Sequence, residues 1–523
     1  MGADGLRHLV LVTGDQLNRD SAAFDDFDPE RDAVWMAELA HEATYVPAHQ
    51  QRLVLFFAAM RHFRDALARD GVTVHYHALA VDPAADRGAG FRGLLREDLP
   101  RRDPERLILV QPGDYRVLTE LREAAAEQAI PLEVREDRHF YCSIDGFAAW
   151  AGDRRSLVME HFYRAMRRQH DVLMDGSQPV GGQWNRDADN RETFGRDGPG
   201  ELPRAPRFEP DPTTRAVIET VDQRFGDHPG DARAFDRPVT PQQARTALDA
   251  FIRDRLPYFG DYQDALWAGE GLLYHSQLSA ALNLHLLDPR EAVDAAVAAY
   301  HQGQAPLNSV EGFVRQILGW REFVRGVYWT HMPGYADSNA LDHHEAVPPL
   351  LWHGETDMAC VADAMRNVIE QGYAHHIQRL MVLGLFAQLY GVHPYAFHEW
   401  HMAMYLDAVD WVSLPNTLGM SQYGDGGVIG SKPYCASGAY IQRMSNHCSS
   451  CRYNPKKAYG DDACPFTTLY WSFLDRHAER LRGNQRLVFQ IRNRDRREAK
   501  GEMAPVREAA ASLRSRIRNG ERV

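Results

Sequence analysis

The feature that most constrains the fold of this 523-residue chain is a change in its hydrophobic periodicity. In the first 135 residues, five short strand-like runs, at 8–13, 33–36, 72–76, 107–110 and 132–134, alternate with stretches of helical spacing. This alternation predicts a doubly wound parallel sheet covered by helices. From about residue 246 the spacing is helical only, so the sequence predicts an α/β domain followed by an all-α domain.

The segment between these parts is rich in Gly, Pro, Asp and Arg, especially over residues 171–245. Such a composition is typical of a connector rather than of a third packed domain. We therefore expect domain boundaries at 1–135, 136–245 and 246–523.

Composition excludes several classes of protein. Charged residues make up 25% and hydrophobic ones 44%, as in ordinary soluble globular proteins. Six cysteines do not form a disulfide framework, no secretory signal pattern precedes the first strand-like run, and no apolar stretch approaches the length of a membrane span. We expect a cytoplasmic protein, without a membrane partner and monomeric.

The net charge of −13 argues against indiscriminate binding to nucleic acid. The charge is uneven, however, because residues 477–523 carry thirteen Lys and Arg against six Asp and Glu. A basic surface that contacts phosphates is therefore compatible with the overall sign, although such a tail is more often a solvated helix face.

Three cysteines near the C-terminal end follow the pattern C-x2-C-x12-C-P: Cys448, Cys451 and Cys464. A gap of two residues lets one turn aim two sulfurs at one centre, and Cys360 is the available fourth thiolate. Structural zinc usually takes two close pairs of cysteines, so this spacing favours an iron–sulfur cluster over zinc. Buried, unligated thiols remain the alternative, above all for Cys360.

Several motifs in this layout resemble those of photolyases and cryptochromes. The flavin-phosphate segment of that family is matched by SQLSAAL at 276–282, and its R-Q-x-x-x-W-R-E-F signature by FVRQILGWREF at 313–323. A double histidine follows in AHHIQRLM at 374–381. With the four cysteines and GDQL at 14–17, the chain resembles the iron–sulfur bacterial cryptochrome/photolyase branch over roughly residues 6 to 480. The repair members of that branch are prokaryotic (6-4) photolyases.

This resemblance implies three cofactors. A [4Fe–4S] cluster would be bound by Cys360, Cys448, Cys451 and Cys464. An antenna, 6,7-dimethyl-8-ribityllumazine, would lie in the N-terminal domain, and FAD in the helical domain. The matching antenna positions are Asp15, Glu38, Glu42 and Tyr45. The matching flavin positions are Ser276, Leu278, Gln316, Arg321, Arg379, Asp407 and Ser413.

The flavin positions suit the chemistry. Ser276 and Gln316 carry hydrogen-bond donors, and an Arg379–Asp407 ion pair beside the ring would stabilise a reduced, anionic flavin. Without the flanking motif, this pair is equally well interpreted as a helix–helix salt bridge.

The double histidine is expected at the lesion. Repair of a (6-4) photoproduct needs a proton near neutral pH, and imidazole titrates in that range. On a helix, His375 and His376 would point about 100° apart, so we expect His376 to lie nearer the lesion and His375 to assist. One core and one surface histidine is the alternative.

Other residues follow from the same resemblance. Tyr434 and Tyr440 would line the lesion pocket, because aromatic faces stack on extruded bases. Phosphate contacts are expected from three basic residues, namely Lys432, Arg443 and Arg452. Trp400 and Trp352 match the photoreduction relay, although a Trp is more often a packing residue.

Two positions depart from the family pattern. His401 stands where the relay has a tyrosine, for which Tyr405 or Trp411 is a candidate replacement. Ser413 stands where an acidic residue is usual near the flavin N5 edge. Both departures bear on the choice between repair and signalling.

The sequence thus predicts a carbon–carbon lyase that repairs (6-4) photoproducts in UV-damaged DNA by light-driven electron transfer from reduced FAD. Two alternatives remain: a blue-light photoreceptor cryptochrome with the same cofactors, and a non-photochemical iron–sulfur protein that binds nucleic acid.

Overall fold

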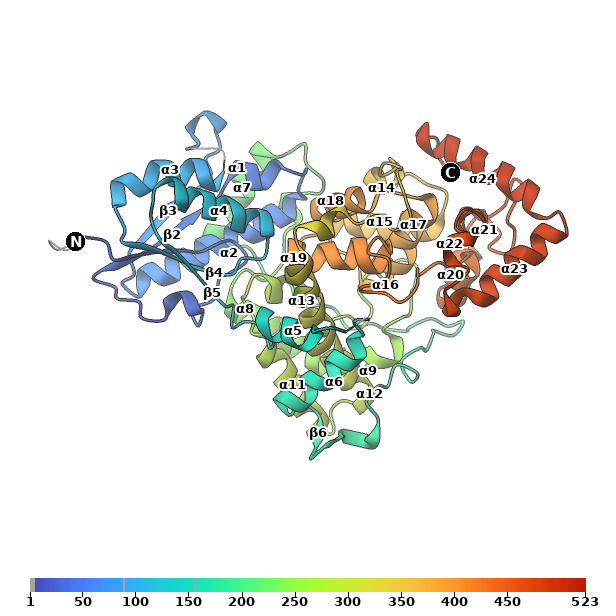
Figure 1. Ribbon diagram of the computed structural model, residues 1–523, viewed down its shortest axis with the longest axis horizontal. Coiled ribbons are helices and arrows are strands. Elements are labelled where there is room, and N and C mark those ends of the chain that lie inside the picture. Colours follow the sequence, from blue (N-terminus) through green and yellow to red (C-terminus); the bar gives the residue numbers. More distant parts are fainter. Residues whose placement is uncertain (1–4, 88–89, 155) are drawn as a thin grey trace.

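A computed structural model describes residues 5–87, 90–154 and 156–523 (Figure 1). Its N-terminal part is built on one parallel sheet in the order β3-β2-β1-β4-β5. The strands are β1 (His8–Leu11), β2 (Asp32–Ala37), β3 (Val74–His77), β4 (Arg106–Val110) and β5 (Leu132–Arg135). They coincide with the five strand-like runs of the sequence, so the predicted fold class is confirmed for this part.

Helices cover both faces of the sheet because consecutive strand residues point to opposite sides. Val10, which pairs with Val34 and Ile108, faces the core that contains α2 (Gln50–Arg69). Leu9 and Leu107 face the other core, which contains α3 (Phe91–Arg102) and α4 (Tyr115–Glu127). The short helix α1 (Ala40–Thr44) follows β2.

The strand order creates a switch point. Strands β1, β2 and β3 extend the sheet to one side, and the chain then returns to place β4 on the other side of β1. The loops after β1 and β4 therefore diverge at one edge of the sheet, which is where doubly wound folds bind their ligands.

The segment expected as a connector contains helices that belong to both neighbours. The helices are α5 (Ile144–Ala151), α6 (Met159–His170) and α7 (Pro212–Arg224), with a hairpin of β6 (Met174–Asp175) and β7 (Gln178–Pro179). Helix α7 packs on α2, whereas α5 and α6 pack on α13 (Glu322–His331). The connector is thus tied to both domains, and its exact boundaries stay a prediction.

The remainder is helical, as predicted. It contains α8 (Pro241–Asp254), α9 (Leu256–Tyr262), α10 (Ser279–Asn283), α11 (Pro289–His301), α12 (Leu307–Val314), α14 (Leu350–His353), α15 (Ala359–Gln371), α16 (His376–Gln378), α17 (Leu385–Tyr390), α18 (Pro394–Met404) and α19 (Asp410–Leu414). The chain ends with α20 (Gly438–Met444), α21 (Pro465–Arg476), α22 (Ala478–Leu481), α23 (Val488–Ala499) and α24 (Met503–Arg518).

Three π-helical turns interrupt these helices: η5 (Arg315–Arg321), η7 (Arg379–Gly384) and η8 (Pro415–Ser421). Turns of this kind are frequent at functional sites because they displace side chains from the regular helical register. Three of the expected flavin residues, Gln316, Arg321 and Arg379, lie on them. Within the described ranges, no helix is both long and apolar enough to cross a membrane.

Candidate functional site

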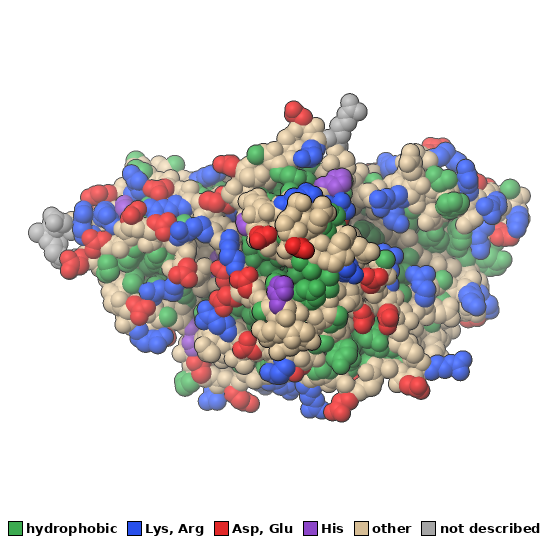
Figure 2. Space-filling view, turned by 90° about the horizontal axis from the view of Figure 1, so that it is seen from below, with side chains coloured by type: hydrophobic (Ala, Val, Ile, Leu, Met, Phe, Trp, Pro, Cys, Tyr) green, Lys and Arg blue, Asp and Glu red, His purple; other side chains and the backbone are tan. Residues whose placement is uncertain are grey.

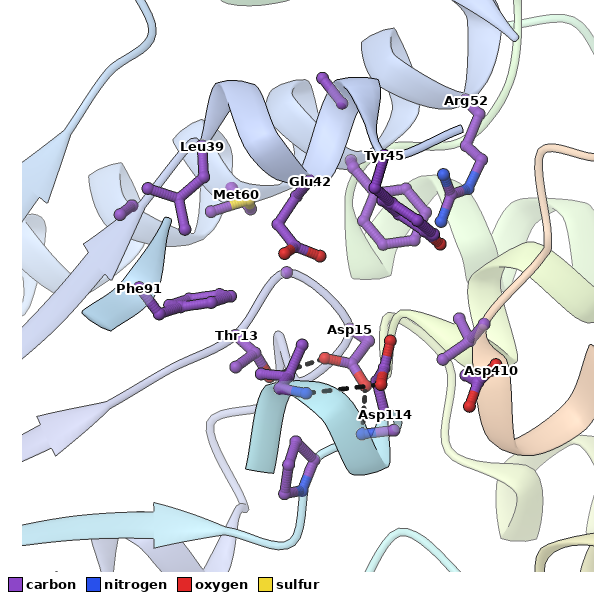
Figure 3. Close-up of a pocket in the computed structure, with 18 of the residues that line it drawn as sticks. Thr13, Asp15, Leu39, Glu42, Tyr45, Arg52, Met60, Phe91, Asp114 and Asp410 are labelled. Atoms are coloured by element: carbon purple, nitrogen blue, oxygen red, sulfur yellow. Dashed lines mark hydrogen bonds between the residues drawn. The ribbon is translucent and has the colours of Figure 1, made fainter. Parts of the chain in front are cut away.

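A cavity of about 110 Å³ lies at the switch point of the sheet (Figure 3). Its walls come from the loop after β1, helices α1 and α2, and the loop after β4, and residues 402, 409 and 410 of the helical domain close it. Leu39, Met60 and Phe91 form an apolar end on the side away from Asp114 and Asp410, with Glu42 between the two sides (Figure 3). The cavity thus offers a slot for a ring and a polar region beside it.

Four carboxylates line the polar region: Asp15, Glu42, Asp114 and Asp410. Asp15 accepts hydrogen bonds from the Thr13 hydroxyl at 2.6 Å and from the Gly113 N–H at 2.9 Å. Glu42 accepts from the Arg116 guanidinium at 2.8 and 2.7 Å. Each carboxylate is therefore held in place by the protein itself.

The other two carboxylates come from different domains, and each is held by groups of its own domain. Asp114 caps α4 by accepting the Arg116 N–H at 2.7 Å. Asp410 accepts from the Tyr328 hydroxyl, and its other oxygen lies 2.8 Å from His398 Nε2. Burial and the nearby Asp410 charge raise the pKa of Asp114 to about 7, and burial also raises the pKa of Asp15.

Three of the four expected antenna residues line this cavity, namely Asp15, Glu42 and Tyr45. Glu38 does not. Its carboxylate accepts from Arg61 at 2.7 and 2.9 Å, from the Tyr76 hydroxyl at 2.5 Å and from the Leu79 N–H at 2.9 Å. These donors hold Glu38 in a hydrogen-bond network that joins β2, β3 and α2. Glu38 therefore lies outside the cavity in which we expected the antenna contacts.

Sequence reasoning missed Arg52, Asp114 and Asp410 in the cavity. The signal for Asp114 was present, because it follows a glycine after β4, as Asp15 follows one after β1, and both strands flank the switch point. Asp410 had no such signal, since it comes from the other domain.

In the helical domain, the expected ion pair is formed between η7 and the loop after α18. Both oxygens of Asp407 lie 3.1 Å from Arg379 Nη1 and Nη2, and the Ser279 hydroxyl donates to Asp407 at 2.6 Å. Arg379 also lies over the Tyr405 ring, 4.0 Å from its centroid. This pair is nearly buried, so its charges are weakly screened.

Two further arginines approach the same region, and sequence reasoning did not single them out. Arg255 is 1% exposed, yet its Nε and Nη1 atoms lack a hydrogen-bond partner. Arg237 donates to the Gln277 side chain at 3.0 Å, next to Ser276, and its Nε lies 3.5 Å from the Asp236 carboxylate without a hydrogen bond. Both arginines act electrostatically on Tyr373, as Arg379 does. Buried guanidinium nitrogens without hydrogen-bond partners are costly, and an anionic ligand would satisfy them.

The other expected flavin residues do not all lie together. Ser276 accepts the Leu278 N–H at 3.3 Å in the turn before α10, and the buried hydroxyl of Ser413 has no partner. Gln316 is exposed and folds back onto the Gly312 carbonyl. Arg321 is buried elsewhere, 4.0 Å from the Phe140 ring centroid and 5.1 Å from that of Trp411.

The two histidines differ sharply in environment. His375 precedes α16 in extended conformation, so the pair does not share a continuous helix as we had expected. Its ring is buried, stacks on His275 at 4.4 Å, and leaves both nitrogens without partners. The side chain of His376 is exposed. Desolvation by neighbouring atoms, together with the Arg379 charge, lowers its pKa to about 4. It therefore lies at an opening close to Arg379.

Tyr434 and Tyr440 are half-buried, and the carboxylate of Asp264 acts on the pKa of both. Arg443 lies 5.5 Å from the Tyr440 ring centroid, and Lys432 is half-buried near Tyr434. Arg452 is paired instead with Asp357 at 2.7 Å. On the face drawn in Figure 2, Lys and Arg side chains gather at the end formed by the C-terminal helices.

Of the expected relay residues, Trp400 lies in an aromatic group with Tyr405. Trp400 is buried, donates from Nε1 to the Leu351 carbonyl at 2.7 Å, and contacts Tyr405 edge-to-face at 5.8 Å. Trp352, the residue after Leu351, is half-buried. His401 packs on Tyr405 at 4.3 Å, so Tyr405 lies between Trp400 and Arg379.

The four candidate cysteines line one pocket, although Cys360 is far from the others in the sequence. Cys360 lies in the first turn of α15, Cys464 precedes α21, and Cys448 and Cys451 lie between α20 and α21. Burial and the three other sulfurs raise the pKa of Cys360 well above its ordinary value. Burial also raises the pKa of Cys448 and Cys464, and a bound metal would favour the thiolate forms that bind it.

In the part of the chain that the structure describes, no three His, Cys, Asp or Glu side chains converge on one ion-sized position. The cysteine pocket therefore does not have the form of a single-ion shell. The two remaining cysteines, Cys435 and the buried Cys142, do not line this pocket.

Comparison with known proteins decides the family. The chain is 46% identical over 484 residues to the (6-4) photolyase of Agrobacterium fabrum, a match that covers 92% of this chain and 94% of that protein. This chain belongs to the photolyase/cryptochrome family. The family model for deoxyribodipyrimidine photo-lyase-related proteins also matches this photolyase-family chain over residues 10–236.

Solved structures agree with this family fold. A bacterial class III photolyase from Agrobacterium tumefaciens matches 85% of this chain and 87% of its own, with a TM-score of 0.54 at 15% identity. A cryptochrome of Synechocystis matches 79% of this chain and 82% of its own, with a TM-score of 0.51 at 14% identity.

Flavin is the cofactor that membership of this family implies. The region around Arg379 fits such a group, because buried polar atoms there lack hydrogen-bond partners. These atoms belong to Arg237, Arg255, Tyr405 and Ser413. An FAD diphosphate would supply acceptors to the guanidinium groups, and its ring edge would reach the hydroxyl groups.

Proposed function

We propose that this protein is a light-dependent (6-4) photolyase, which repairs pyrimidine–pyrimidone (6-4) photoproducts in DNA. The observation that carries the proposal is the 46% identity to a (6-4) photolyase over nearly the whole of both chains. At that level, the activity named for the relative is the best supported activity for this chain.

FAD, when bound and reduced, would supply one electron to the lesion on illumination. In our proposal Arg379 and Asp407 hold the isoalloxazine, and Ser276, Leu278, Arg237 and Arg255 hold the diphosphate. The ion pair favours a reduced, anionic ring because its guanidinium lies inside a region of low dielectric. Ser413, neutral and unpaired, would lie near the ring edge.

His376 would deliver the proton that accompanies the electron. Its exposure lets it reach a bound lesion, while Arg379 three residues later holds the flavin. Desolvation and the Arg379 charge lower the pKa of this imidazole to about 4, which favours its neutral form in the free protein. Damaged DNA would bring negative charge to this part of the surface and favour the protonated imidazole. His375, stacked on His275, would hold the backbone of His376 in place.

Tyr434 and Tyr440 would stack on the extruded bases, and Lys432 and Arg443 would contact phosphates. Trp400 and Trp352 would carry electrons from the surface toward the flavin, with Tyr405 between Trp400 and the Arg379–Asp407 pair. The switch-point cavity would hold a 6,7-dimethyl-8-ribityllumazine antenna against Asp15, Glu42 and Tyr45.

The cysteine pocket would hold a [4Fe–4S] cluster rather than zinc. A cluster spreads its four thiolates over separate iron corners, and this suits four cysteines that share a pocket without converging on one ion. We propose a structural role for it, since it joins α15 to the segment before α21.

The test is illumination of the reduced protein with an oligonucleotide that carries one (6-4) photoproduct. We expect light, but not darkness, to restore the two pyrimidines. Chromatography of the digested DNA measures this. A photoreduced protein that leaves the lesion intact would favour the photoreceptor alternative, which Ser413 and His401 motivate.

A further inference from the structure

The outer side of α23 carries exposed basic side chains around one exposed aromatic ring. This set, the α23 face, consists of Arg486, Phe489, Arg492, Asn493 and Arg496. We propose that the α23 face binds the phosphate backbone of the duplex DNA that flanks the lesion. The inference rests on the proposed repair function and adds to it a contact surface outside the lesion pocket.

The spacing of these residues places them on one side of the helix. Three exposed residues follow Phe489 at intervals of three, four and seven positions, namely Arg492, Asn493 and Arg496. Residues three and four apart are neighbours on a helix surface, so these side chains form one continuous strip. The opposite side packs inward through Ile491, where α23 contacts α21 and α24. The ring of Phe489, which is 73% exposed, therefore projects from the middle of a basic strip.

The arginines of the α23 face carry charge that the protein does not neutralise. Among the residues that the structure describes, none forms a salt bridge with Arg486, Arg492 or Arg496. The two carboxylates of α23 pair with arginines outside the face: Asp495 with Arg482 at 2.9 Å, and Glu498 with Arg507 at 2.5 Å. The face is thus ready to bind an anion, and its guanidinium groups suit phosphate.

The α23 face begins beside the expected lesion pocket. Asn484, just before α23, donates from Nδ2 to the Ser431 carbonyl at 3.1 Å, and Lys432 and Tyr434 follow Ser431. Burial raises the pKa of Tyr434 and the Arg486 charge lowers it, so Arg486 lies close to this ring. From there α23 runs along the end of the molecule that is remote from the sheet (Figure 1).

Duplex DNA matches this face in charge, length and position. The 12 residues of α23 span about 18 Å, over which one strand of a duplex carries about five phosphates. An acidic protein would match the charge as well. DNA is favoured because the flank of a lesion held at Tyr434 already lies next to Arg486. The arginines would bind phosphates, and Phe489 would contact the sugars between them.

The test measures binding to a duplex of about thirty base pairs that carries one (6-4) photoproduct, by fluorescence anisotropy over a range of salt concentrations. For the double variant Arg492→Gln with Arg496→Gln, we expect affinity to fall about tenfold. The slope of log affinity against log salt should fall by about 2, because two phosphate contacts are lost. Phe489→Ala should weaken binding without changing the slope, since an apolar contact releases no counterions.

The matched control is Arg122→Gln with Arg215→Gln, which removes two exposed charges from α4 and α7 in the other half of the molecule (Figure 1). Affinity and slope should both stay at the wild-type values. Because phosphate contacts carry no sequence information, Arg492→Gln with Arg496→Gln should weaken binding to undamaged duplex by a similar factor. Shortening the duplex on one side of the lesion should abolish the effect of that variant, and shortening the other side should not.

Wild-type affinity and slope in Arg492→Gln with Arg496→Gln would overturn the inference and would leave an acidic protein as the partner of the α23 face. An equal effect of the control variant would also overturn it, because the loss would then reflect net charge alone. A wild-type protein that does not prefer the damaged duplex would contradict the proposed function instead, so the two failures are distinguishable.

Discussion

The two cofactor regions differ in how complete they are without a ligand. In the switch-point cavity, every carboxylate already accepts hydrogen bonds from protein donors. Around Arg379, by contrast, buried nitrogens and hydroxyls on Arg255, His375, Tyr405 and Ser413 have no partner. Since an unpaired buried polar group costs about 1–3 kcal/mol, we predict that the helical region gains more stability from a bound cofactor than the cavity does.

The largest effect should come from removing the flavin. Loss of a ligand that binds only the folded state, at a concentration a thousandfold above its Kd, removes about 4 kcal/mol of stability. We expect FAD-free protein to unfold several degrees below the holoprotein, and antenna-free protein to unfold close to it. Differential scanning calorimetry measures both. Equal losses of stability in the two forms would remove the distinction between the regions.

Breaking the ion pair should be nearly as costly. Asp407→Asn leaves the Arg379 charge buried without its partner, so we expect a loss of about 3 kcal/mol and release of flavin. Urea unfolding and flavin absorbance measure the two effects. The control is Glu291→Gln, whose exposed pair with Arg245 should contribute less than about 1 kcal/mol. A fully stable Asp407→Asn protein that retains flavin contradicts the assignment.

A smaller, pH-dependent effect is expected at the cavity. The folded protein keeps the Asp114 proton up to about pH 7, while the unfolded chain releases it near its ordinary pKa of 3.8. The contribution of this group to the free energy of unfolding therefore falls as pH rises through that window. Asp114→Asn should flatten this fall. Chemical unfolding at several pH values tests this, and an unchanged slope would mean that Asp114 is ionised throughout.

The smallest effect on cofactor content should come from Glu38→Gln. Its carboxylate is held by Arg61, Tyr76 and Leu79 outside the cavity, so the variant should lose stability but bind the antenna as the wild type does. The ratio of antenna to flavin absorbance in purified protein measures this. A selective loss of antenna would return Glu38 to the site.

The sequence predicted the sheet, its five strands and the helical domain because periodicity reports which faces are buried. It also predicted four cysteines that the structure brings to one pocket, since the short gap between Cys448 and Cys451 fixes them locally. Residues whose position depends on distant contacts were harder to place. Gln316 lies on the exposed side of a π-helical turn, and periodicity does not reveal such turns.

Charge compensation was equally hidden from the sequence. The family resemblance places Glu38 among the antenna contacts. In the structure, its carboxylate accepts instead from Arg61, Tyr76 and Leu79. Arg237 and Arg255 were not predicted, because only the tertiary structure shows that buried nitrogens on both lack hydrogen-bond partners. Asp410 was likewise not predicted, because only the packing of the two domains places it in this cavity.

The most direct test of the account is the yield of repaired (6-4) photoproduct per light flash in wild type and His376→Asn, with affinity for the damaged DNA measured in parallel. Because His376 is exposed beside Arg379, the account predicts that the variant binds the lesion and is photoreduced normally, yet loses at least about 100-fold in repair. Wild-type yield in the variant would contradict it.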